Sequence, residues 1–274
     1  MEQPPTHEFD VDTQVRPLGD GLWRGEVSHR WSIGPYPNGG YVLAIALAAV
    51  RHELPHPDPF TVTAHYYRPP QHAPVDVAVE RIRSGRAHSS AMARIIQDDR
   101  ELVRVLANYG DHSQSHGPTV VQAEPPPMPP PDECEPAPSG GPMPNGLVAA
   151  IRDRIEWRVA PDRVGWLRGQ RTGHAVTGGW VRFADGRPAD VDALPLIADC
   201  LPPPVFDVVD GGWVPTLELT VHVRARPVPG WLRCWFRTRF LIDGYLEEDG
   251  EVWDEDNRLV AQSRQLARLE PPPG

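Results

Sequence analysis

One acid interrupts an apolar stretch in the second half of the chain, where it could act as a base. The stretch reads LPLIADCLPPP from Leu194 to Pro204, and its acid is Asp199. A short helix here would hold the carboxylate near its C-terminal end, where the helix dipole disfavours negative charge. The plainer roles are an exposed helix end or a buried acid that a neighbouring group satisfies. The residues alone leave these three roles open.

Two more polar residues follow Asp199 in predicted strands. In LVAQSRQLARL, strand alternation places Gln265 on a small, apolar face. A buried amide needs partners, which are either backbone groups or a carboxylate and a water. Thr216 begins the strand TLELTVHVRARP and adds a hydroxyl, although threonine is ordinary at a strand start. The other residues on the face of Gln265 are Leu259, Ala261, Ser263, Ala267 and Leu269.

A glycine pair opens the apolar segment of the first half. PNGGYVLAIALAAVRHEL predicts a helix from Asn38 to about Leu54, apolar on nearly every side and therefore buried. Gly39 and Gly40 either let this helix enter close against a strand, or expose N–H groups that can polarise a carbonyl oxygen. In both cases the backbone, not a side chain, is the important part.

The composition excludes several classes of function. The chain has 274 residues, 40% of them hydrophobic, and a net charge of −10. Such an acidic chain lacks the basic face of a nucleic-acid-binding protein, so no nucleic-acid partner is expected. The 27 basic residues are all arginine. Without lysine there is no Schiff-base lysine and no P-loop.

No metal or cofactor site is predicted. HELPH at His52 to His56 matches the H-E-x-x-H zinc motif, but Pro55 breaks the helix that the motif requires. The three cysteines are widely spaced, which favours neither a disulfide framework nor a zinc site. The N-terminus lacks a signal-peptide pattern, and no apolar run reaches the roughly 18 residues of a membrane span. We therefore expect a cytoplasmic protein without a membrane span.

A proline-rich segment divides the chain. Residues 112–146 contain EPPPMPPPDECEPAPSGGPMPNG, a composition typical of an extended connector. This division predicts an N-terminal unit at residues 1–111 and a C-terminal unit at residues 147–274.

The two halves repeat one pattern. Arg68-Pro69 recurs as Arg226-Pro227 at an offset of 158 (226 − 68), which an internal duplication explains. Each half has a predicted helix followed by antiparallel strands: four strands between Phe60 and Gly110 in the first half, and a helix over Val191–Leu201 before strands from Thr216 on in the second. A buried helix must be covered, so each sheet should wrap around its helix. The predicted fold is α+β, a double hotdog with a long central helix in each unit and continuous sheets.

At these segments the sequence resembles the double-hotdog acyl-CoA thioesterases, of the acyl-CoA thioesterase II type. In the first half the resemblance lies in PNGGYVLAIAL, TAHYYRP and RSGRAHSSAMARIIQDDRELV; in the second it lies in IADCLPP, PTLELTVH and LVAQSRQLA. It implies that Asp199, Thr216 and Gln265 are the acid, hydroxyl and amide that activate a water against the thioester, without a covalent intermediate. The neighbours Thr220 and Gln262 are alternatives in register.

The resemblance also implies an acyl-CoA substrate, no cofactor and a place in fatty acid metabolism. Substrate contacts are expected at Gly39, Gly40 and Tyr41. Because the first helix has no carboxylate from Asn38 to His52, whereas the second carries Asp199, one site is expected per chain. Hotdog sheets have free edges, so a homodimer or larger homo-oligomer is expected. Two other functions stay open: an enoyl-thioester hydratase or dehydratase, and an acyl-CoA- or lipid-binding protein without catalysis.

Overall fold

The computed structural model describes residues 6–271. In the first half, the strands of the main sheet lie in the order β1-β2-β6-β7-β8-β5 and are antiparallel, as predicted. The strands β6, β7 and β8 are neighbours in chain order, whereas β5 pairs with β8 and not with β6. The elements are α1 (Glu8–Thr13), β1 (Arg16–Gly19), β2 (Leu22–Glu26), β3 (Ser32–Ile33), β4 (Tyr36–Pro37), α2 (Gly39–Glu53), β5 (Asp58–Tyr66), β6 (Pro74–Ser84), β7 (Ser89–Gln97) and β8 (Arg100–Gly110). The short strands β3 and β4 pair with each other, and Ile33 of β3 also forms a bridge with Ala149.

The second half continues the same sheet in the order β12-β16-β15-β13-β11-β10-β9, with β14 beside β15. Its elements are β9 (Glu135–Pro136), β10 (Ile155–Val159), β11 (Val176–Phe183), α3 (Leu194–Ile197), β12 (Thr216–Val223), β13 (Leu232–Arg237), β14 (Leu241–Ile242), β15 (Tyr245–Trp253) and β16 (Leu259–Arg268). Short 3-10 helices connect several of them.

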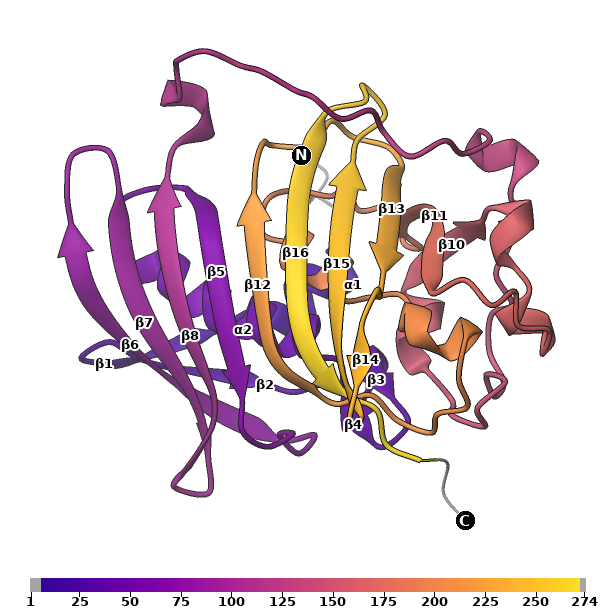
Figure 1. Ribbon diagram of the computed structural model, residues 1–274. Coiled ribbons are helices and arrows are strands. Elements are labelled where there is room, and N and C mark those ends of the chain that lie inside the picture. Colours follow the sequence, from indigo (N-terminus) through magenta and orange to yellow (C-terminus); the bar gives the residue numbers. More distant parts are fainter. Residues whose placement is uncertain (1–5, 272–274) are drawn as a thin grey trace.

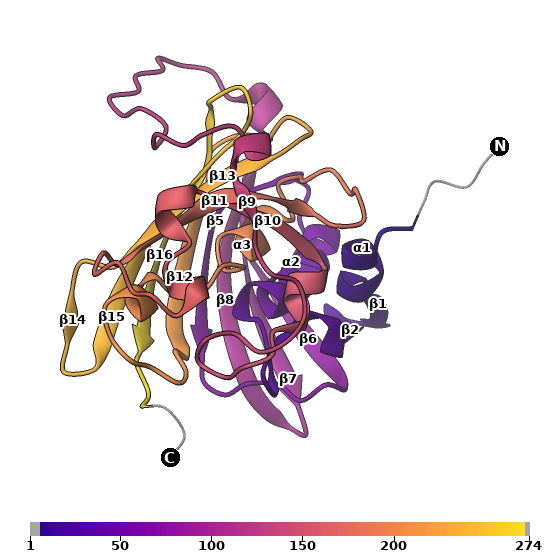
Figure 2. The same cartoon turned by 90° about the vertical axis from the view of Figure 1, so that its right-hand side faces the viewer.

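One curved sheet therefore spans both halves, joined where β5 pairs with β12 (Figure 1). The helices α2 and α3 contact each other and lie on the same side of this sheet (Figure 2). The apolar side chains between sheet and helices form the main core. No helix within residues 6–271 is long and apolar enough to cross a membrane.

The helix α2 is buried along most of its length, as the sequence predicts. The Asn38 side chain caps its N-terminus by accepting a hydrogen bond from the Tyr41 N–H (2.9 Å). The helix ends at Glu53 because Leu54 has extended backbone and Pro55 cannot continue a helix. Since sheet and neighbouring helices cover its body, only its ends can take part in a site.

The second half lacks the long helix predicted over Val191–Leu201. In the structure α3 has only four residues, with no side-chain N-cap and a proline, Pro195, in its first turn. Three more prolines at residues 202–204 prevent a helix from continuing past Leu201. The prediction of a long central helix in each unit is therefore wrong for the second half. Asp199 lies in the turn after α3, not in a helix.

The part of the proline-rich segment around Pro126 and Pro129 packs against the second half of the sheet, on the face away from the helices (Figure 1). The Pro129 carbonyl accepts a hydrogen bond from the Trp180 indole (2.8 Å), and the Pro126 carbonyl accepts one from Arg233 (3.3 Å). The Arg233 guanidinium lies 4.6 Å from the centre of the Trp180 ring. These contacts hold the segment on β11 and β13.

An ion pair reinforces the junction between the halves. The Arg226 guanidinium donates two hydrogen bonds to the Asp58 carboxylate (3.0 and 2.9 Å). Asp58 begins β5, and β12 begins at Thr216, an offset of 158 (216 − 58) that matches the sequence repeat. The two equivalent strands thus lie side by side at the centre of the sheet.

Candidate active site

Asp199 reaches from the turn after α3 to the N-terminus of α2. Its Oδ2 accepts hydrogen bonds from the Gly40 N–H (2.7 Å) and from the Asn38 side-chain amide (3.0 Å). The same amide also donates to the Asp199 backbone carbonyl (2.7 Å). A helix N-terminus favours negative charge, so the acid of one half is held by the helix of the other.

The two glycines allow this close approach. A Cβ on Gly40 would lie 2.7 Å from the Pro195 carbonyl oxygen and 2.9 Å from the Leu196 Cα, and these backbone atoms cannot move aside alone. A Cβ on Gly39 would lie 3.1 Å from the Asp199 carboxylate. The glycine pair therefore serves the contact between α2 and α3, which brings the carboxylate to the helix end.

The environment of Asp199 suits a base. Burial raises its pKa to about 6, while the hydrogen bonds from Gly40 and Asn38 oppose that rise. Near neutral pH the carboxylate is thus mostly ionised, yet more basic than an exposed aspartate. A base whose pKa lies near the working pH transfers protons efficiently.

Gln265 and Thr216 meet on neighbouring strands on the core side of the sheet. The Thr216 hydroxyl donates to the Gln265 Oε1 (2.6 Å), from β12 to β16. Gln265 is buried, between the buried Ala261 and Ala267 along its strand, as the predicted alternation requires. Because the hydroxyl occupies the amide oxygen, the amide N–H groups of Gln265 remain as donors.

Thr220 and Gln262, the two alternatives to Thr216 and Gln265, lie on the face of the sheet away from the core. The Thr220 hydroxyl donates to the Glu218 carboxylate (2.5 Å) and lies 2.9 Å from the Thr63 hydroxyl. Gln262 is exposed. The observed register therefore places Thr216 and Gln265, and neither alternative, toward the core.

Glu248 is a buried acid that the sequence analysis did not single out. It is paired with Gln265 between β15 and β16 and is only 5% exposed. Its pKa is raised to about 8, first by burial and then by the negative charge of Asp199. Strand alternation in YLEEDGEVW could have found it, because Glu248 shares a face with Leu246 and Val252. The electrostatic effect of Asp199 indicates that both carboxyl groups lie in one region of the core.

The backbone N–H groups at the start of α2 have different partners. The Gly40 N–H binds Asp199, and the Tyr41 N–H binds the Asn38 side chain. Within residues 6–271 the Gly39 N–H has no acceptor. Among the three residues expected to contact substrate, Gly39 is therefore the one whose backbone N–H is free to donate to a substrate oxygen.

Two tyrosines contact this helix in different ways. The Tyr41 hydroxyl donates to the Asp12 carbonyl (2.9 Å), so the side chain expected to contact substrate is occupied near α1 instead. Tyr66, which the sequence analysis did not select, donates its hydroxyl to the Gly39 carbonyl (3.0 Å). Burial, and then the charge of Asp199, raises the Tyr66 pKa well above its usual value. Tyr66 therefore stays a neutral donor that supports the helix start.

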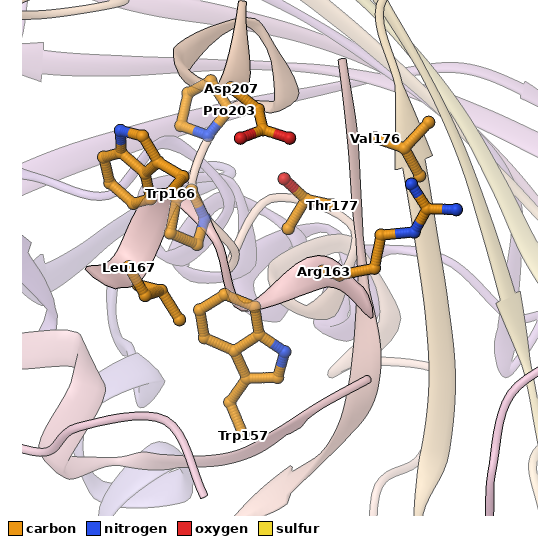
Figure 3. Close-up of a pocket in the computed structure, with 9 residues that line it drawn as sticks. Trp157, Arg163, Trp166, Leu167, Val176, Thr177, Pro203 and Asp207 are labelled. Atoms are coloured by element: carbon orange, nitrogen blue, oxygen red, sulfur yellow. The ribbon is translucent and has the colours of Figure 1, made fainter. Parts of the chain in front are cut away.

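A small pocket lies beyond the prolines that follow Asp199 (Figure 3). Trp157, Trp166 and Leu167 form much of its apolar wall, and the Thr177 and Asp207 side chains point toward each other across it. The residues Asp199, Thr216 and Gln265 are not among those that line it. The pocket is therefore separate from the polar cluster around Asp199.

The histidines of HELPH turn to separate partners. The His52 ring stacks on Trp23 with 4.6 Å between ring centres, and the His56 Nδ1 lies 2.9 Å from the Ser89 hydroxyl. In the part of the chain that the structure describes, no group of three or more His, Cys, Asp or Glu side chains could hold a metal ion. The zinc motif in the sequence is therefore not assembled in three dimensions.

Comparisons with known proteins agree with this architecture. An uncharacterized protein of Mycobacterium tuberculosis is 27% identical over 95% of this chain and 98% of its own. A candidate thioesterase II from Thermobifida fusca is 28% identical, with a TM-score of 0.89 over 98% of this chain and 99% of its own. A protein of unknown function with the hot dog fold from Alicyclobacillus acidocaldarius is 23% identical, with a TM-score of 0.86 over 98% and 100% of the two chains. The chain thus has the hot dog fold.

Two family models cover most of the chain. The model of the acyl-CoA thioesterase N-terminal domain matches residues 27–110, and that of the acyl-CoA thioesterase C-terminal domain matches residues 131–269. Together they include both glycines at the start of α2 and all three polar residues of the second half. The chain belongs to the acyl-CoA thioesterase family.

Proposed function

We propose that the protein hydrolyses acyl-CoA thioesters with a water that Asp199 activates and that Gln265 and Thr216 hold. The observation that carries this proposal is the position of the Asp199 carboxylate at the N-terminus of α2, in the interior that also holds the Gln265 amide. A base, a water ligand and a free backbone donor are the groups that thioester hydrolysis needs.

The reaction follows from the directions of the hydrogen bonds. Thr216 occupies the Gln265 amide oxygen, so the Gln265 N–H can donate to the water oxygen. Asp199 accepts a proton from that water as its oxygen attacks the thioester carbon. The base thereby gains a proton, and no bond forms between enzyme and acyl group.

The start of α2 supplies the complementary charge. As the carbonyl oxygen becomes negative, it lies toward the Gly39 N–H, where the helix dipole also stabilises it. The tetrahedral intermediate then collapses and breaks the carbon–sulfur bond. The sulfur leaves with the bonding electron pair and takes the proton from Asp199, so the products are the free acid and CoA and the base is restored.

We further propose a double hotdog arrangement, with units at residues 1–111 and 147–274 and a connector at residues 112–146. The mirrored strand order on either side of the β5–β12 junction supports it, as does the 158-residue offset between equivalent strands. The short α3 makes the second unit an incomplete copy, and the site draws on both units.

Two other functions are less well supported. A hydratase or dehydratase calls for an Asp–His pair, whereas the groups that bind the Asp199 carboxylate are the Gly40 N–H and the Asn38 amide. A purely binding protein gains nothing from a buried base with a raised pKa, because burying that charge costs stability.

The test is the release of free CoA from acyl-CoA substrates of graded chain length. Asp199→Asn keeps the size of the side chain and removes the base, so kcat should fall about 10²- to 10⁴-fold. Asp192→Asn is the matched control, since this nearby acid pairs with Arg51 at the surface and should leave kcat unchanged. Undiminished hydrolysis by Asp199→Asn contradicts the proposal. Hydration of an enoyl-CoA, or binding without turnover, would indicate one of the other two functions.

A further inference from the structure

A row of polar side chains crosses the core face of the sheet and extends past the residues that the mechanism uses. Gln265 on β16 has Leu219 on β12 as its register partner on one side and Glu248 on β15 on the other. Glu248 is buried, and its Oε2 has no hydrogen-bond partner within the described residues. An unpaired buried carboxyl oxygen lowers the free energy of unfolding, which suggests a functional reason for its presence in this site.

A second unpaired group lies at the next position of this row. Arg237 pairs with Asp249 between β13 and β15, so Thr238 falls at the register position beside Glu248. The Thr238 hydroxyl is also buried and lacks a partner in the described part of the chain. A carboxyl group with its own proton could donate to one neighbour and accept from another, whereas an ionised one could only accept.

The charges around Glu248 oppose its ionisation, and a hydrogen bond from the Gln265 side chain favours it. Asp199 reaches this region from the turn after α3, and Asp249 follows on the same strand. Asp249 faces the other side of the sheet, where it pairs with Arg239 and Arg264. The flanking strands present Gln265 and Thr238, which do not titrate, and no ion pair to Glu248 is found among the described residues.

We propose that Glu248 is a positioning residue of this site, a carboxyl group that stays neutral while Asp199 is ionised and that orients the Gln265 amide. Two carboxyl groups in one low-dielectric interior cannot both carry charge cheaply, so one takes the base role and the other keeps its proton. This role rests on the proposed hydrolysis, because it acts through the residue that holds the water.

The consequence is a limited pH range of activity. The pKa values of about 6 for Asp199 and about 8 for Glu248 place the productive state, with the first ionised and the second neutral, between these values. As Glu248 ionises, its oxygens become acceptors only and draw the Gln265 N–H groups away from the water. Activity should therefore fall on the alkaline side although the base Asp199 remains ionised.

The test compares the pH dependence of kcat/KM for the wild type, Glu248→Gln and Glu251→Gln. Glutamine can still donate and accept but cannot ionise, so Glu248→Gln should keep kcat within about 3-fold at pH 7 and lose the alkaline decline. Glu251 lies on the same strand and accepts a hydrogen bond from the Trp253 indole (3.1 Å), so Glu251→Gln should retain the wild-type profile. KM should not change in either variant.

Two outcomes would overturn the proposal: an unchanged alkaline decline in Glu248→Gln, or a loss of more than about 100-fold at pH 7 in a folded variant, which would mean that the carboxyl itself reacts. An infrared pH-difference spectrum provides a readout independent of turnover. The wild type should lose the band of a protonated carboxyl between pH 7 and 9, and Glu248→Gln should not. If the band titrates but neither the wild type nor the variants release CoA, the proposed hydrolysis is wrong, whereas the neutral state of Glu248 is confirmed.

Discussion

Gly40→Ala tests the contact on which the whole site depends. The new methyl group would lie 2.7 Å from the Pro195 carbonyl oxygen, 2.9 Å from the Leu196 Cα and 3.0 Å from the Asp199 Cβ. Two of these are backbone atoms, so the segment from α3 to Asp199 must move away from α2 as a unit. That movement stretches the hydrogen bond from the Gly40 N–H to Asp199, now 2.7 Å.

The expected change in the free energy of unfolding is the sum of three contributions, one stabilising and two destabilising. Replacing a helical glycine by alanine should stabilise by about 1 kcal/mol through helix propensity alone. Overpacking a close contact costs about 1–3 kcal/mol, and weakening a hydrogen bond to a charged group costs about 1.5–3 kcal/mol. The net loss is about 3 kcal/mol, or a Tm lower by about 6–12 °C for a chain of this size.

Thermal unfolding and CoA release should be measured together. A displacement of about 1 Å at the base can cost about 100-fold in rate, so kcat/KM should fall with Tm. Gly39→Ala is the graded control, because its methyl group meets side-chain atoms of Asp199 and Tyr66 at 3.1 and 3.3 Å, which can shift. If Gly40→Ala is as stable and active as the wild type, the close contact between the two halves is refuted.

Two more predictions concern the same cluster. Thr216→Val should lower kcat about 3- to 10-fold by releasing the Gln265 amide, whereas Thr220→Val, on the opposite face, should leave CoA release unchanged; equal effects would contradict the assigned register. Folding raises the pKa of Asp199 from 3.8 to about 6, so the folded protein binds a proton at this group more tightly than the unfolded chain does. The contribution of Asp199 to the free energy of unfolding is therefore fully present below pH 4 and is lost as the pH rises through 6. Asp199→Asn should therefore stabilise the protein by on the order of 3 kcal/mol at pH 7 and by little at pH 4, as urea unfolding at both values can check.

Local sequence patterns determined much of the fold. The apolar run after Asn38 specified α2, because cap and composition act within a few turns. Period-2 alternation specified the strands and placed Gln265 toward the core. The acid Asp199 also stood out, since a single charge in an apolar run is conspicuous against its neighbours.

Other features were decided only by the tertiary structure. The four-residue helix α3 and the turn after it replaced the longer helix predicted over Val191–Leu201, because the apolar composition of a short segment does not distinguish a helix from a packed turn. Glu248 lies in an acidic run, and it differs from the acids beside it only in that its side chain is on the core face of the strand. Above all, the bond from Gly40 to Asp199 spans 159 residues. It forms only when the two halves join through β5 and β12, and no local pattern encodes a distance set by the closing of a sheet.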